Sequence, residues 1–360
     1  MTKKDLITII IPTYNEEKFI QKCLQSVQSF LLPKDIKIEI IVIDGGSKDN
    51  TTEIVLNMIE QDKRIVLLDN PKKIQAVALN IGISKSNGEW ILRLDAHAMY
   101  PSDYLKLCFE TAIRTNADNV GGLIITQPGG TGYQASLVQA LTTHIFGVGN
   151  SGFRTGISEG EVDTVPFGFF NRDVFEKIGY FDERLIRAQD YEFNKRIKNN
   201  GGKIWLNPGI VAQYYNQKSI LKFLEKQILK EAPYNAYMWY LVPYTFAYRH
   251  AITGVFATGV LGGLALSLVS PVIKFLFLSV MALYFIVAFV SAVQQAKRFK
   301  KPLHILTLPI SFFLYHIIHG IGVLTGFFRL ATGTSPIQKI KEPWEGYGSY
   351  RIKLNKSLKK

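Results

Sequence analysis

Cysteine is nearly absent from this chain of 360 residues, which carries only Cys23 and Cys108. Two cysteines outside any shared motif exclude a disulfide framework and the paired spacing of a structural zinc site. Residues 1–5 contain no apolar stretch of the kind found in a signal peptide. We therefore expect the N-terminal domain to stay in the cytoplasm. The sequence also has no internal repeat and no low-complexity linker.

Acidic residues are scarce, since 29 Asp and Glu stand against 42 Lys and Arg and the formal net charge is +13. Most of the excess lies in residues 294–360, which hold twelve Lys or Arg and two acidic residues. A basic chain can bind nucleic acid. Here the positive charge borders apolar segments, so we expect anionic membrane lipids as the partner and no nucleic acid.

The first hundred residues alternate between apolar, β-branched runs and segments with apolar residues at helical spacing. The runs are residues 6–11, 38–43, 65–68 and 89–94. Strands that alternate with helices predict an α/β domain with a mostly parallel, Rossmann-like sheet.

Polar side chains follow three of these runs. The turn from Thr13 to Glu16 follows the first, Asp44 ends the second, and Asp95 and His97 end the fourth. Ligands of such sheets bind at the carboxyl ends of the strands, which predicts a site there. Residues two apart on extended backbone point the same way. A carboxylate and an imidazole placed like this suit a divalent ion that also holds phosphate oxygens.

Five motifs, in order, resemble those of family 2 glycosyltransferases, which are inverting enzymes. They lie at residues 10–16, 42–51, 78–83, 94–97 and 165–196. The Asp-Ala-His form and the Gln-Asp-x-Glu box are most similar to the subgroup typified by a succinoglycan glucosyltransferase, which builds bacterial exopolysaccharide. The resemblance covers residues 6–215. It implies a nucleotide-diphospho-sugar-binding glycosyltransferase A fold.

The resemblance implies which residues bind the nucleotide sugar. Tyr14 and Asp44 hold the base and ribose, and the UDP-sugar donor is expected to be UDP-glucose. The family commonly has two consecutive acids at the second strand end, but here Gly45 follows Asp44. Asp49 is expected to cap a helix rather than to touch ligand. The remaining members of the expected site are Pro12, Thr13, Glu16, Asn80, Arg93 and Asp95.

The family's Asp-x-Asp metal motif takes the form Asp95-Ala96-His97. The resemblance implies that Asp95 and His97 bind a divalent cation, Mn²⁺ or Mg²⁺, which offsets charge on the departing diphosphate. An imidazole in place of a carboxylate favours Mn²⁺. Two alternatives remain for His97, direct contact with a phosphate and simple packing.

The resemblance also implies that Asp190 is the catalytic base. Inversion in one displacement needs a carboxylate that takes the proton of the acceptor hydroxyl. The first acid of the family's acidic pair is here Gln189. Asp190 has one alternative role, the N-cap of a helix over residues 191–198. Arg196 is expected to be a structural or phosphate partner.

The last third of the chain is apolar. Residues 251–270 and 275–293 carry no charge and are long enough to cross a membrane as a hairpin. A third apolar segment, 303–328, contains Pro, His and Gly. An amphipathic and then aromatic stretch over 219–249 is typical of a membrane interface. We therefore expect a cytoplasmic glycosyltransferase domain (1–218), an interfacial region (219–249), a membrane region (250–330) and a basic tail (331–360).

Charge bears on the topology of the third segment. Basic residues at 297–301 and 351–360 flank it on both sides, and such residues tend to stay in the cytoplasm. The segment is then re-entrant or interfacial. The alternative is a true third span with an external tail.

Three functions remain in competition. The first is a membrane-anchored enzyme that adds one sugar to a polyprenyl-pyrophosphate-linked acceptor for exopolysaccharide or capsule synthesis. The second is a processive polysaccharide synthase, but such family members carry a Gln-x-x-Arg-Trp box that this sequence lacks. The third is a non-catalytic nucleotide-binding scaffold, which predicts damage to Asp95 or Asp190. Both aspartates are present, so we favour the first function.

Overall fold

The computed structural model describes residues 3–149, 151–337 and 344–347. The chain divides into two compact units. The first comprises Met1–Ile125, Gly156–Tyr214 and Lys339–Lys360, and the second comprises Thr126–Thr155 and Tyr215–Gln338. The sequence predicted a boundary near residue 218, but it gave no sign that 126–155 would join the apolar helices.

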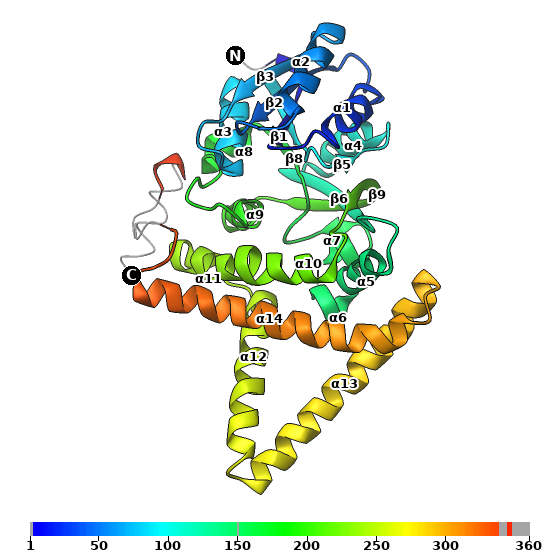
Figure 1. The fold of residues 1–360 in the computed structure, drawn as a ribbon. Coiled ribbons are helices and arrows are strands. Elements are labelled where there is room, and N and C mark those ends of the chain that lie inside the picture. Colours follow the sequence, from blue (N-terminus) through cyan, green and yellow to red (C-terminus); the bar gives the residue numbers. More distant parts are fainter. Residues whose placement is uncertain (1–2, 150, 338–343, 348–360) are drawn as a thin grey trace. The chain divides into compact units, whose positions relative to one another are not determined.

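The first unit begins with the predicted alternation of strands and helices (Figure 1). Strands β3, β2, β1 and β4 are parallel neighbours in that order. Their carboxyl ends therefore share one edge of the sheet, which confirms the predicted α/β fold. The elements are β1 (Lys3–Thr13), α1 (Ile20–Gln28), β2 (Lys37–Asp44), α2 (Thr51–Gln61), β3 (Ile65–Asp69), α3 (Gln75–Lys85) and β4 (Gly88–Arg93).

The other half of the sheet is mostly antiparallel. Strand β8 pairs with β4 on one side and with β6 on the other, and β9 pairs with β5 and β7. The resulting mixed sheet has the order β3-β2-β1-β4-β8-β6-β9-β5. The elements are β5 (Ala98–Met99), α4 (Tyr104–Thr115), β6 (Asn119–Gln127), β7 (Gly160–Glu161), β8 (Phe169–Asn171), α8 (Asp173–Ile178), α9 (Gln189–Asn199) and β9 (Ile204–Tyr215).

The core of the first unit lies around β1 and β2. Ile9, Ile10 and Ile11 of β1 are fully buried although they point alternately to the two faces, because both faces of a parallel sheet are covered. Helix α3 approaches β1 at Gly82, where a Cβ would lie 2.7 Å from Cγ2 of Ile10. The absence of a side chain at Gly82 thus permits the close approach of α3 to the sheet. The start of α3 borders the site.

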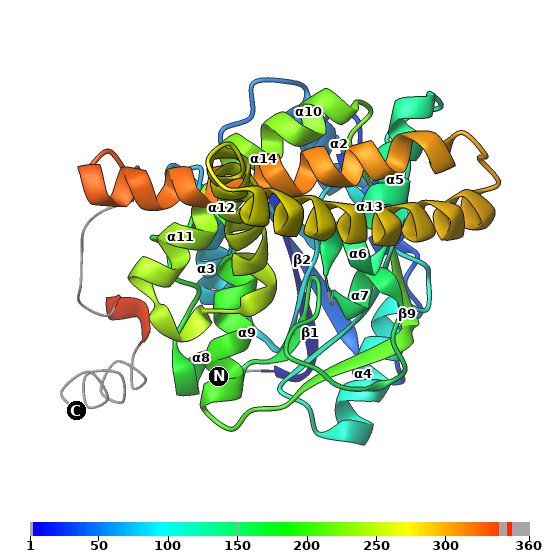
Figure 2. The ribbon, with the colours of Figure 1, turned by 90° about the horizontal axis from the view of Figure 1, so that it is seen from below.

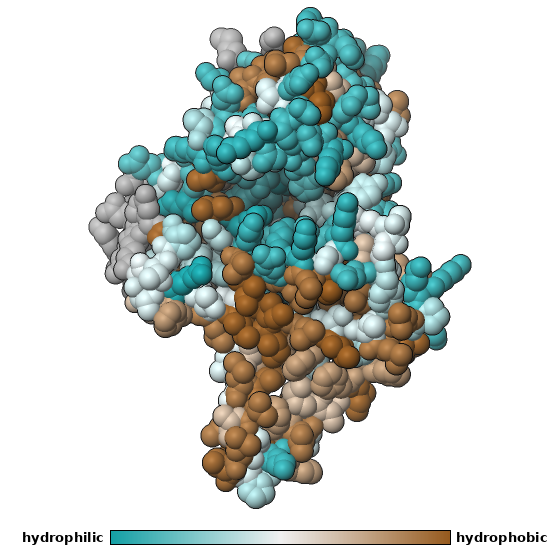
Figure 3. Space-filling model, viewed as in Figure 1, coloured by the Kyte–Doolittle hydropathy of each residue, from teal (hydrophilic) through white to brown (hydrophobic). Residues whose placement is uncertain are grey.

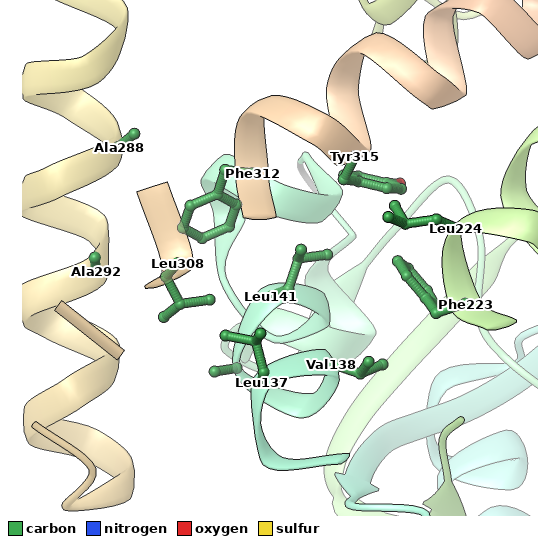
Figure 4. Close-up of a cluster of buried hydrophobic side chains, with 11 residues drawn as sticks. Leu137, Val138, Leu141, Phe223, Leu224, Ala288, Ala292, Leu308, Phe312 and Tyr315 are labelled. Atoms are coloured by element: carbon green, nitrogen blue, oxygen red, sulfur yellow. The ribbon is translucent and has the colours of Figure 1, made fainter. Parts of the chain in front are cut away.

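The second unit is helical. Its core joins α5 to α10, α13 and α14, which come from distant parts of the sequence (Figure 4). This packing explains why 126–155 belongs to the second unit. The elements are α5 (Tyr133–Thr142), α6 (Ile145–Val148), α7 (Gly152–Thr155), α10 (Ile220–Lys226), η1 (Gln227–Glu231), α11 (Ala232–Leu241), η2 (Pro243–Thr245), α12 (Tyr248–Ser267), α13 (Pro271–Phe299) and α14 (His304–Thr332).

Three helices of the second unit, α12, α13 and α14, are long and apolar enough to cross a membrane. Helices α12 and α13 form a hairpin whose surface is largely hydrophobic (Figure 3). The predicted turn over residues 271–274 was misplaced, because α13 starts at Pro271 and the turn is 268–270. Ser270 caps α13, with its side chain accepting the Ile273 amide, and proline suits the first helical position.

Helix α14 is one continuous helix that includes Pro309. The chain therefore does not reverse direction inside the third apolar segment, as it would in a re-entrant loop. The helix runs across the axis of α12 and packs on α11 and α13 (Figures 1 and 2). Two arrangements remain, an interfacial helix and a third span.

Candidate functional site

A pocket opens at the carboxyl ends of β1 to β4 in the first unit. It brings together six residues that the sequence predicted for the site, from turns far apart in the chain: Pro12, Thr13, Tyr14, Glu16, Asp95 and His97. The rest of its wall is Gly45, Asn70, Lys73, Ile74, Gln75, Ala78, Ala96, Ile186 and Arg187.

Arg93 joins the two carboxylates expected to do the chemistry. Its Nη2 lies 2.8 Å from Oδ1 of Asp95, and its Nη1 lies 3.3 Å from Oδ2 of Asp190. The Arg93 side chain is buried, and its guanidinium faces the ring of Phe167. A buried cation between two acids offsets part of their desolvation cost. Arg93, predicted as a nucleotide-sugar ligand, thus holds Asp95 and Asp190 in one cluster.

Asp190 does not cap its helix. Helix α9 starts at Gln189, the N-cap position is Ala188, and the Asp190 side chain in the first turn faces Arg93. Burial raises the pKa of Asp190 above its ordinary value, and the Arg93 charge opposes that rise. The alternative of an N-cap was therefore wrong. Among the residues that the structure describes, no helix amide donates to the Asp190 carboxylate, which faces Arg93 instead.

Two glutamines extend this cluster. Gln189 Nε2 donates to Oε1 of Gln75 at 2.8 Å, and Gln75 Nε2 donates to Oδ1 of Asp95 at 3.3 Å. Gln75 was missed in the sequence because nothing around it resembles a catalytic motif. Its position as the first residue of α3, which follows β3 after the turn 70–74, was the only signal.

Glu16 and His97 form a second pair in the pocket, with 3.0 Å between Oε1 and Nδ1. If Nδ1 carries the proton, it donates to Glu16 and Nε2 becomes the nitrogen that can bind a metal. Within the described ranges, no group of three or more His, Cys, Asp or Glu side chains could hold a metal ion. An ion here would therefore need oxygens from a diphosphate as well as Asp95 and His97.

Asp44 shapes the loop after β2. Its carboxylate accepts hydrogen bonds from the amides of Gly46 and Ser47 and from the Ser47 hydroxyl. This loop brings Gly45 against Tyr14, where a Cβ at position 45 would lie 3.3 Å from Cδ2 of the ring. The glycine that departs from the family pattern therefore leaves room for the half-exposed Tyr14 ring. Direct contact between Asp44 and a nucleotide stays a prediction.

The side chains of Asp49 and Asn80 form hydrogen bonds with the backbone of other residues. Asp49 accepts the amides of Thr51 and Glu17, but the N-cap position of α2 is Asn50, so Asp49 supports the helix start without being the expected cap. Asn80 is not part of the pocket wall, because its amide holds both backbone groups of Phe181. A contact between Asn80 and the nucleotide sugar stays a prediction.

Two other charged side chains of the last motif have structural roles. Arg196 and Glu192 are fully buried and paired at 2.7 Å, and Arg196 also donates to the carbonyls of Ile178 and Tyr180. These contacts fix α9 against the end of α8. Arg196 is therefore a structural residue, in line with one of its two expected roles.

Comparison with known proteins identifies the domain. The sequence profile of glycosyl transferase family 2 matches residues 8–179. A curated relative from Methanococcus voltae, dolichyl N-acetyl-alpha-D-glucosaminyl phosphate 3-beta-D-2,3-diacetamido-2,3-dideoxy-beta-D-glucuronosyltransferase, is 28% identical over 90% of this chain and 98% of its own length. Succinoglycan biosynthesis protein ExoA of Rhizobium meliloti is 29% identical over 59% of this chain and 64% of its own length.

A solved structure supports the fold. The mannosyltransferase PcManGT from Pyrobaculum calidifontis, in complex with GDP-Man and Mn²⁺, has a TM-score of 0.60 and 20% identity, over 90% of this chain and 88% of that protein. The likeness shows the same fold. The family 2 profile over residues 8–179 and the curated relatives identify the chain as a glycosyltransferase with a family 2 domain.

Proposed function

We propose that this enzyme transfers one hexose from a nucleotide sugar to a lipid-linked acceptor at the cytoplasmic face of the cell membrane. The observation that carries the proposal is the cluster of Asp95, Arg93 and Asp190 beside a pocket at the carboxyl edge of the sheet. A carboxylate for the diphosphate and a carboxylate for the acceptor proton are the two groups that an inverting transfer needs.

The donor is a UDP-sugar, and UDP-glucose is our first choice. Tyr14 offers an exposed ring on which a base can stack, next to Pro12 and Thr13. Among the described residues, Thr13 Oγ1 and Asn70 Oδ1 are buried polar atoms without a hydrogen-bond partner, and both residues line the pocket. A bound nucleotide would satisfy such atoms. Glucose follows from the resemblance to the succinoglycan subgroup.

Asp95 and His97 would hold a divalent cation, with Mn²⁺ favoured over Mg²⁺. The donor set fits, because one carboxylate and one imidazole, oriented by Glu16, leave room for diphosphate oxygens. The ion would act as a Lewis acid on the leaving diphosphate. The related mannosyltransferase from Pyrobaculum calidifontis was solved with Mn²⁺.

Asp190 would accept the proton of the acceptor hydroxyl as that oxygen attacks the anomeric carbon. Arg93 lies 3.3 Å away and orients the carboxylate, and its charge opposes the rise in the pKa of Asp190 that burial causes. Two other acids of the last motif form ion pairs with arginines: Glu192 pairs with Arg196, and Asp182 pairs with Arg184. This leaves Asp190 as the acid on α9 that is directed to the site.

The acceptor is a sugar on a polyprenyl pyrophosphate. The relative from Methanococcus voltae is named for a dolichyl-phosphate-linked acceptor and matches this chain over nearly its whole length. Three helices long enough to span a membrane would hold the enzyme at such a substrate. Basic side chains at 297–301 would bind anionic lipid headgroups there.

The experiment measures transfer in membranes that contain the full chain. A panel of radiolabelled sugar nucleotides is tested with polyprenyl phosphate and polyprenyl pyrophosphate acceptors. We expect UDP-glucose and a pyrophosphate acceptor to give product. Transfer from no donor in the panel would contradict the proposed substrates.

The Asp190→Asn variant tests the base in the same assay. It keeps the shape of the side chain but cannot take up a proton, so turnover should fall by about 10²-fold or more. Donor binding, followed by titration of nucleotide, should hardly change. Asp173→Asn is the matched control, because Asp173 is an exposed acid on α8. Normal turnover of Asp190→Asn would remove this residue from the mechanism.

A further inference from the structure

Residues 179–183 belong to the family motifs but do not line the nucleotide pocket. They form a seat for the C-terminal segment 344–347. Gly179 has a φ of +84°, and a Cβ at this position would collide with the carbonyl oxygen of Gly346. The next amide, that of Tyr180, donates to the same carbonyl at 2.9 Å. The glycine is therefore required both for its backbone conformation and for this close approach.

Tyr347 is the anchor of the segment. Its side chain is fully buried, and its hydroxyl donates to Oδ2 of Asp182 at 2.5 Å. The guanidinium of Arg196 lies 4.5 Å from the centre of the ring. Burial raises the pKa of Tyr347 well above its ordinary value, so the hydroxyl keeps its proton and remains a donor. The Tyr347 side chain is thus held by a hydrogen bond to a buried carboxylate and by a cation–π contact.

The two partners of Tyr347 stand at the two ends of segment 182–196, which comprises the loop that leads to Asp190 and most of α9. Asp182 starts this loop, where its carboxylate also binds Arg184 at 2.6 Å. Arg196 lies on α9, fully buried and paired with Glu192. Between these ends the chain contributes Ile186 and Arg187 to the pocket wall and then enters α9. A residue bonded to both ends restricts how far the loop and α9 can move apart.

We propose that Tyr347 is a positioning residue for the active site, which holds the 182–190 loop and the start of α9 so that Asp190 stays beside Arg93. The inference rests on the proposed role of Asp190 as the base. Tyr347 does not line the nucleotide pocket. The chain reaches it only after α14, so the segment that follows the last apolar helix completes the geometry of the catalytic unit.

Three variants of the full-length enzyme test this. Tyr347→Phe removes the hydroxyl and keeps the ring, and Tyr347→Ala removes both. Tyr180→Phe is the matched control, because Tyr180 is a partly exposed tyrosine of the same seat whose backbone, rather than its hydroxyl, binds Gly346. The readouts are the turnover number, the affinity for nucleotide and the hydrogen exchange of the amides in 182–190.

We expect Tyr347→Phe to lower kcat by about tenfold, the scale of one hydrogen bond to a charged group. Nucleotide affinity should stay within about twofold, since the strands that carry the rest of the pocket are unchanged. Exchange in 182–190 should rise in Tyr347→Phe and more in Tyr347→Ala, while Tyr180→Phe should match the unmodified enzyme.

The exchange readout does not depend on the identity of the substrates or the base. If Asp190→Asn proved active but exchange rose as expected, the proposed base would fail while the positioning contact stood. Unchanged exchange in 182–190 together with normal kcat in Tyr347→Phe would overturn the proposal. So would an equal rise in Tyr180→Phe.

Discussion

Arg93 is the residue through which the two carboxylates of the site influence each other. It is buried at the end of β4 and contacts Asp95 on its own segment and Asp190 on α9. Both acids therefore share one positive charge. Removing that charge should alter the proton affinity of Asp190 as well as its position.

A change of pH tests this coupling. Asp190 must be ionised to act as a base, so kcat/KM should fall as the pH drops through its pKa. Burial raises that pKa and the charge of Arg93 opposes the rise. In Arg93→Gln the opposing charge is gone, and the acidic limb of the pH profile should move to higher pH. Arg114→Gln, at an exposed arginine, should leave the profile unchanged. An unmoved limb in Arg93→Gln would refute the coupling.

The proposed metal ligands give a second prediction at this scale. Asp95→Ala should abolish transfer, because the ion at the diphosphate would lose its carboxylate. His97→Asp restores the commoner Asp-x-Asp pattern and should keep activity, with a shift in preference from Mn²⁺ toward Mg²⁺ because carboxylate suits the harder ion. Transfer rates with each ion, after treatment with EDTA, provide the measurement. Full activity in EDTA would contradict the metal site.

At the scale of elements, glycines set the packing of α14. Gly320 faces α12, where a Cβ would collide with the carbonyl oxygen of Thr253. Gly322 and Gly326 face η1 and α11 on another side of the helix. Small residues at such contacts let helix backbones approach closely. The glycines of the third apolar segment are thus the residues that allow it to pack closely.

Gly326→Ala should therefore destabilise the second unit. The added Cβ would lie 2.6 Å from the carbonyl oxygen of Pro233, a backbone atom that cannot rotate away. Overpacking of this kind costs about 1–3 kcal/mol. Gly262→Ala in α12 is the matched control, since nothing lies within 4 Å of its added Cβ. Thermal unfolding in detergent should show a lower Tm for Gly326→Ala alone. Equal Tm values for both variants would show that this contact has no such effect.

For the whole molecule, the distribution of basic residues bears on the side of the membrane on which the C-terminus lies. Lys297, Arg298, Lys300 and Lys301 lie at the end of α13 and directly after it, and the basic residues 351–360 of the expected tail lie outside the described residues. The crosswise course of α14 on α12 suits a helix that lies along the interface. Both basic stretches would then share the cytoplasmic side, as the positive-inside tendency requires.

A reporter fused after Lys360 should accordingly read as cytoplasmic. A second reporter inserted in the turn 268–270, between α12 and α13, should read on the opposite side. The pair tests orientation independently of activity. An external readout after Lys360 would show that α14 is a third span, and it would leave the transferase assignment intact.

Sequence alone was enough for the α/β fold and for six residues of the pocket wall. Apolar runs such as that of β1 can only be buried on both faces, and a parallel sheet brings the ends of its strands to one edge. Tyr14, Asp95 and His97 could therefore be placed together from their positions after strands. The apolar length of α12 and α13 likewise predicted membrane helices.

Contacts between distant segments were decided only by the tertiary structure. Nothing near Gln75 or Tyr347 in the sequence reveals that one binds Asp95 and the other Asp182. Asn80 fits the family motif, but its amide is used by the backbone of Phe181. Local patterns record which face of a strand or helix is buried, whereas the partner of a polar side chain depends on how the chain folds back. That is why the sequence predicted the site and the structure supplied its connections.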